Sequence, residues 1–155
     1  MSTKKAFLTE TVPNLLPGLK PDTAPQFGLM TPQHMIEHLT SIIKSTVKRY
    51  GEPDPALADR QAGFKRFIHK GAVFKYRPSD KTKADLPTLK YDTLEEAVAQ
   101  ILVAIERFYN HYEQNPGFQA YHAFMGELNF EELELFHYQH VRYHFWQFGL
   151  IPEYS

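Results

Sequence analysis

The chain has 155 residues, with 17 Lys and Arg against 18 Asp and Glu, and no cysteine. Its formal net charge of −1 gives no electrostatic basis for binding nucleic acid. The lack of cysteine excludes disulfides, thiolate nucleophiles and Cys-ligated metals, so a metal site has to use His, Asp or Glu. No apolar run approaches the roughly 20 residues that span a membrane. We therefore expect a cytoplasmic protein that forms a single domain, residues 1–155.

Prolines dominate the first 30 residues and predict at most a short helix near residues 11–16, followed by an extended arm. The first strong helix is predicted over residues 31–50. Thr31 suits its N-cap, Pro32 its first helical position, and Gly51 the residue that ends it.

The middle of the chain, residues 52–91, has weaker patterns. A helix is predicted from Pro55 to near Gly71, and a long polar loop follows it. Basic residues outnumber acidic ones in this loop. A solvated surface and a patch that receives an anionic substrate both explain the excess, and the sequence leaves the two readings open.

Two strong helices are predicted in the second half. One begins at Thr93 and closes before Asn115; its apolar stripe has no ligand-type residue, so we expect it to be structural. The other runs from an N-cap at Asn129 to Gly149. Together the segments predict an all-α four-helix bundle with a long irregular crossover between the second and third helices.

Histidines cluster on the last predicted helix. His137, His140 and His144 fall within about 60° of one face, and His140 and His144 are one turn apart. A metal in a bundle core takes ligands from facing helices, and His38 borders the apolar stripe of the helix at 31–50. This spacing predicts a mononuclear site of His38, His140 and His144 with an open fourth position. His137 is expected to support that site or to pack in the core.

Two segments resemble one known family. Residues 27–39 (FGLMTPQHMIEHL) and 137–149 (HYQHVRYHFWQFG) are similar to the DinB-like superfamily, in particular to an uncharacterised branch with a C-terminal HxxxHxxQFG motif. The resemblance implies a four-helix bundle, a divalent metal on His38, His140 and His144, and a homodimer as one assembly. Gln147 matches the motif and is expected to orient a ligand. His34 stands where the pattern has Gln, and His122 lies in a connector that departs from the pattern; both are pocket candidates.

The function expected from these residues is that of a metal-dependent transferase or hydrolase acting on a small-molecule substrate, with no nucleic-acid or membrane partner. The metal is zinc, nickel or iron, since imidazoles accept all three. Some members of the superfamily use a low-molecular-weight thiol, which this resemblance implies as a cofactor. The alternative is a non-catalytic, metal-stabilised binding module of unknown ligand. No general base or nucleophile is identifiable from the sequence, so catalytic residues are unknown and enzyme activity stays open.

Overall fold

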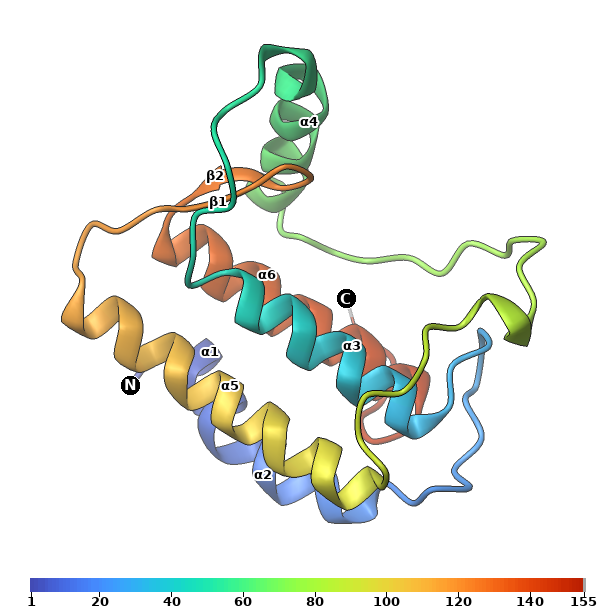
Figure 1. Ribbon diagram of the computed structural model, residues 1–155. Coiled ribbons are helices and arrows are strands. Elements are labelled where there is room, and N and C mark those ends of the chain that lie inside the picture. The colour runs from blue at the N-terminus through green and yellow to red at the C-terminus, as the bar shows by residue number, and fades with distance from the viewer. Residues whose placement is uncertain (155) are drawn as a thin grey trace.

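The N-terminal region is helical over a longer stretch than its prolines suggest. The computed structural model describes residues 1–154, so residue 155 of the predicted domain lies outside the described residues (Figure 1). The short elements α1 (Thr3–Ala6), η1 (Phe7–Thr11), α2 (Val12–Leu15) and η2 (Leu16–Gly18) follow one another directly. The Pro13 ring is incompatible with regular α-helical hydrogen bonding to the preceding turn. The turn before it, η1, is π-helical, and the helical path continues in α2 through Pro13.

Helix α3 (Pro32–Ser45) begins where the sequence predicts and ends earlier than expected. The Thr31 side chain accepts a hydrogen bond from the His34 amide, and Pro32 opens the first turn. The predicted end near Tyr50 is wrong, because the chain beyond Thr46 leaves the helix to pair with a strand. The Tyr50 amide donates to the Tyr121 carbonyl at 2.8 Å.

The fold is not the all-α four-helix bundle that the sequence predicts. Strands β1 (Ala120–His122) and β2 (Gly126–Leu128) form an antiparallel hairpin. Three-residue strands carry too little alternation to be visible in a sequence. The hairpin packs on α4 (Ala58–His69), where Nε2 of the Gln61 side chain donates to the Ala123 carbonyl at 2.9 Å. Gly126 has φ +79°, and a Cβ there would lie 2.8 Å from Gln61 Cβ.

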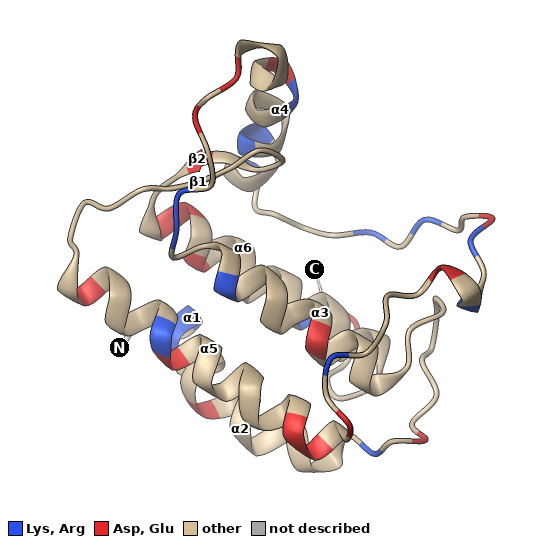
Figure 2. Cartoon of the chain, in the orientation of Figure 1, with Lys and Arg blue, Asp and Glu red and all other residues tan. Residues whose placement is uncertain are grey.

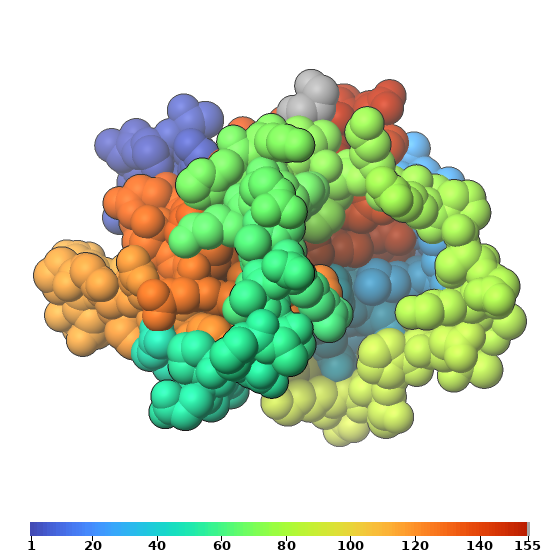
Figure 3. Space-filling model, turned by 90° about the horizontal axis from the view of Figure 1, so that it is seen from above, coloured from blue at the N-terminus to red at the C-terminus, as the bar shows by residue number. Residues whose placement is uncertain are grey.

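Between α4 and α5 (Leu94–Gln114) the chain has little regular structure. Its one described helical turn is η4 (Lys83–Asp85), and η3 (Pro55–Leu57) precedes α4. Viewed from above, this segment frames a hollow in which residues of α3 and of the last helix are visible (Figure 3). The segment is held to α3 by Glu37, which accepts the Lys90 amide at 2.6 Å and the Tyr91 amide at 3.2 Å.

The core lies among α3, α5 and α6 (Phe130–Gln147), which run side by side (Figure 1). Asn129 and Glu132 form the predicted capping box at the start of α6. At its end, Gly149 has φ +70° and the Leu150 amide donates to the Phe145 carbonyl at 2.8 Å, which is a Schellman motif. Among the described residues, no helix is long and apolar enough to cross a membrane; the compartment stays a prediction.

Candidate metal centre

Three histidines from two helices meet between α3 and α6. One nitrogen from each of His38, His140 and His144 lies within 4.8 Å of the others. The Nε2 atoms of His38 and His140 are 3.2 Å apart. His140 and His144 are buried, whereas His38 is half-buried and lies at the accessible edge of the cluster.

The spacing fits a small divalent ion. With metal–nitrogen bonds of 2.0–2.1 Å, two ligands at corners of a tetrahedron are about 3.4 Å apart. The separation of His38 and His140 Nε2, 3.2 Å, is close to that edge. The widest spacing in the set, within 4.8 Å, needs only a small side-chain adjustment to reach the same geometry. The donor set therefore suits a three-histidine ion with a further coordination position open.

Gln147 fixes which nitrogen of His144 faces the cluster. The Gln147 Nε2 amide donates to the Phe27 carbonyl at 3.0 Å, so its Oε1 has to point toward His144. Oε1 is 2.7 Å from His144 Nδ1 and can only accept, so Nδ1 carries the proton. The lone pair of His144 is then on Nε2. A carbonyl or amide partner of this kind orients and polarises an imidazole ligand.

Residues 26–28, in the N-terminal arm that precedes α3, hold Gln147 in place. Gln26 donates its backbone amide to the Gln147 carbonyl at 2.7 Å and its side chain to the Trp146 carbonyl at 2.7 Å. Gly28 has φ +81°, and a Cβ there would lie 2.7 Å from Gln147 Nε2. The arm can therefore approach α6 this closely only because residue 28 is glycine.

The three imidazoles are neutral near pH 7. Burial lowers the pKa of His38. Burial, and then repulsion from the charge that His38 would carry, lower the pKa of His144 to about 4 against the opposing hydrogen bond to Gln147. Burial, together with the neighbouring histidines, lowers the pKa of His140 well below its ordinary value. Neutral imidazoles present lone pairs, so protons do not compete with a metal near neutrality.

Aromatic rings enclose the buried side of the cluster. Phe74 lies against His140 with ring centroids 4.9 Å apart, and Phe136 stacks on the same ring at 5.2 Å. Phe74 comes from the irregular segment and is anchored by the Tyr154 hydroxyl, to which its amide donates at 2.6 Å. Sequence reasoning did not place Phe74 or Tyr154 at the site. Phe74 lies in the brief alternation of residues 73–76, which does not show which ring it meets, and Tyr154 lies beyond the last predicted helix.

His137 packs in the core and lies outside the three-histidine cluster. Its Nε2 is 2.8 Å from Thr46 Oγ1, and its ring meets Phe108 edge to face. Burial lowers its pKa to about 3, so the ring is neutral. The sequence left two roles open for His137, support of the metal site and packing in the core, and these contacts fit core packing. The contact with Thr46 lies where α3 ends.

The remaining candidate histidines lie apart from the cluster. His34 is tied to the Thr31 hydroxyl at 2.7 Å and to the Pro87 carbonyl at 2.9 Å, so it holds the irregular segment to α3. His122 lies on β1 and accepts the Phe124 amide at 3.0 Å through Nδ1. His69, expected at the surface, is exposed and lies 2.6 Å from Glu132.

A family model, described as a protein of unknown function (DUF1569), matches residues 26–150. This match covers α3 through α6 and all three clustered histidines, and the chain belongs to that family. Comparisons with curated proteins and with solved structures found no match.

Proposed function

We propose that this chain is a metal-dependent transferase or hydrolase that holds one divalent ion on His38, His140 and His144. The observation that carries the proposal is the tautomer of His144: a backbone-anchored amide turns its lone pair toward two other neutral imidazoles. The two sequence motifs, residues 27–39 and 137–149, contain His38, His140 and His144, and they support membership of the DinB-like superfamily.

Each residue of the site has a separate task. When bound, a divalent ion supplies Lewis acidity at its open position. His38, His140 and His144 bind it, and Gln147 keeps His144 in the binding tautomer. Phe74 and Phe136 cover His140 and exclude water from that side. The less buried edge at His38 leaves a route for a substrate or a low-molecular-weight thiol.

Turnover decides between this function and a non-catalytic module. We expect the zinc-, nickel- or iron-loaded chain to consume electrophiles with one of several thiols, or to hydrolyse one of a panel of esters and amides. His38→Ala removes a ligand and should lower the rate at least about 100-fold, a loss typical of removing a catalytic group. The control, His69→Ala, removes an exposed histidine outside the cluster and should retain the rate.

Metal binding without turnover on either panel would instead indicate a module in which the ion stabilises the fold or a bound ligand. Equal rates in wild type and His38→Ala would contradict the metal-dependent mechanism. Assembly as a homodimer stays a prediction.

A further inference from the structure

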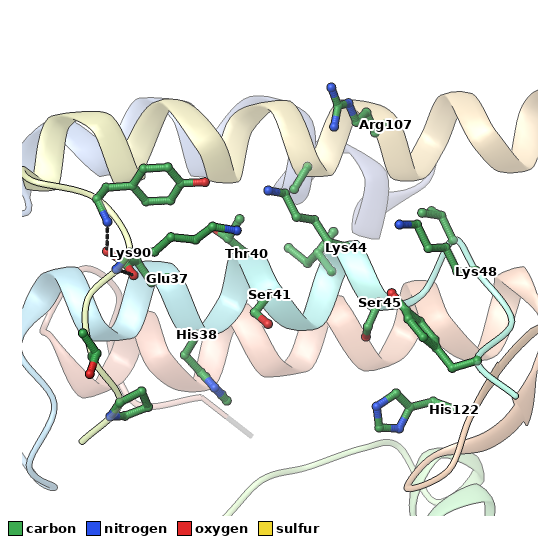
Figure 4. Close-up of a pocket in the computed structure, with 17 residues that line it drawn as sticks. Glu37, His38, Thr40, Ser41, Lys44, Ser45, Lys48, Lys90, Arg107 and His122 are labelled. Carbon is green, nitrogen blue, oxygen red and sulfur yellow. Dashed lines mark hydrogen bonds between the residues drawn. The ribbon is translucent and has the colours of Figure 1, made fainter. Parts of the chain in front are cut away.

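A groove of about 780 Å³ runs along α3, between α5 and residues 87–91 (Figure 4). His38 lies on its wall, at the edge where the metal centre is accessible, and His122 lines it further along α3. The groove is therefore continuous with the only metal ligand that is not fully buried.

Four basic side chains line this groove: Lys44, Lys48, Lys90 and Arg107. Figure 2 shows that α3 and α5 each carry a Lys or Arg position. The one acidic side chain in the lining, Glu37, is already hydrogen-bonded by two backbone amides and by Gln33 Nε2. Since the whole chain carries a net charge of −1, the groove is a local concentration of positive charge.

The cations of the groove have no carboxylate partner within the described residues. The ion pairs of residues 1–154 use Arg49, Lys65 and His69 instead. A single lysine without an ion-pair partner is common on protein surfaces and does not by itself indicate a binding site. Four cations without an ion-pair partner among the described residues line one concave site beside the candidate metal centre, which is an arrangement that attracts an anionic ligand.

His122 adds a hydrogen-bond donor. The Phe124 amide donates to His122 Nδ1 at 3.0 Å, so this nitrogen carries a lone pair and the proton of the neutral ring is on Nε2. The hydroxyl of Ser41, exposed on α3, is a further polar group of the lining. A phosphate or carboxylate would find both charge and donors here.

We propose that the groove binds the charged part of a small-molecule substrate or cofactor that carries at least two negative charges as phosphate or carboxylate groups. Its reacting end then lies at His38 beside the metal. This assignment rests on the proposed function for its reacting end, whereas anion binding depends on the groove alone.

The test uses 8-hydroxypyrene-1,3,6-trisulfonate, a fluorescent trianion whose sulfonates bind metals weakly. Its fluorescence anisotropy is titrated with the zinc-loaded full chain at low salt, because exposed charges are screened at high salt. We expect Lys44→Gln with Arg107→Gln to weaken binding about tenfold. The matched control, Lys81→Gln with Lys83→Gln, removes the same charge from residues outside the groove and should stay within about twofold of the wild type.

Displacement identifies the chemistry of the ligand. Displacement by glycerol 3-phosphate assigns a phosphate, and displacement by glutarate assigns a dicarboxylate. The proposal is overturned if neither displaces the dye, or if the groove pair and the control pair weaken binding equally.

Chelation separates this proposal from the metal site. Zinc is removed with EDTA, and the chelator, itself a polycarboxylate, is then removed by gel filtration; dye binding should persist in this metal-free protein, which circular dichroism shows to be folded. Loss of dye binding with the metal would place the anion on the ion and overturn the groove assignment. If the dye still binds to a chain that takes up no metal, the result supports anion binding in the groove and contradicts the proposed metal-dependent function.

Discussion

At the scale of single residues, the metal centre depends on the direction of one amide. Gln147 accepts from His144 and donates to the Phe27 carbonyl, so neither of its polar groups can rotate without losing a hydrogen bond. This contact was only partly visible in the sequence. The motif indicated that Gln147 orients a ligand, and the i,i+4 spacing indicated the pair His140 and His144. Neither could identify the carbonyl of Phe27 as the partner, because it lies 120 residues away.

Replacing Gln147 by leucine should weaken zinc binding about 10- to 100-fold, the loss typical of removing a group that orients a metal ligand. The Leu side chain keeps the volume and accepts no hydrogen bond, so His144 is free to adopt the other tautomer. Competition with a fluorescent zinc chelator measures the affinity.

The matched control is Gln139→Leu, on the same helix, which loses a hydrogen bond to the Gly71 carbonyl instead. Equal zinc affinities for the two variants would show that the Gln147 contact has no part in metal binding.

At the scale of elements, the sequence predicted the starts of the three strong helices and the ends of α5 and α6, but not the end of α3. Thr31, Thr93 and Asn129 each cap a helix through the predicted side-chain contact, since a cap is a local pattern of a few residues. The end of α3 was not predicted because the chain after it pairs residues 48–50 with Tyr121, a contact between segments far apart in the chain. The hairpin was not predicted because its strands have only three residues each. Like the end of α3, the aromatic cover of the site depends on a contact between distant segments.

The contact between the N-terminal arm and α6 can be tested at Gly28. Gly28→Ala places a methyl group 2.7 Å from Gln147 Nε2, on top of the strain of a positive φ, so it should lower both the unfolding temperature and the zinc affinity. Gly117→Ala is the control: its φ is +84°, and a Cβ there meets nothing within 4 Å.

Both variants should lose about 1–3 kcal/mol of stability from backbone strain, measured by thermal unfolding. Only Gly28→Ala should also lose zinc affinity. A Gly28→Ala chain that binds zinc as the wild type does would contradict the role of the arm in placing Gln147.

At the scale of the whole molecule, α3 and α6 bring together residues separated by about a hundred positions, and His38 meets His140 across that distance. The apolar stripe beside His38 and the shared helix face of His140 and His144 made this meeting predictable, because a metal in a bundle core takes ligands from facing helices. The overall architecture was predicted wrongly, since the short strands of the hairpin carry too little alternation to be recognised. The hairpin and the irregular segment after α4 also supply Phe74, Lys90 and His122, which surround the site.

Metal content tests the central claim most directly. The full chain is reconstituted separately with zinc, nickel and iron(II), freed of excess metal and measured by elemental analysis together with a His140→Ala variant that circular dichroism shows to be folded. We predict about one ion per chain in the wild type for at least one of these metals, and none in the variant, because two histidines hold an ion far less tightly than three. Absence of bound metal from the wild type after all three reconstitutions would contradict the account.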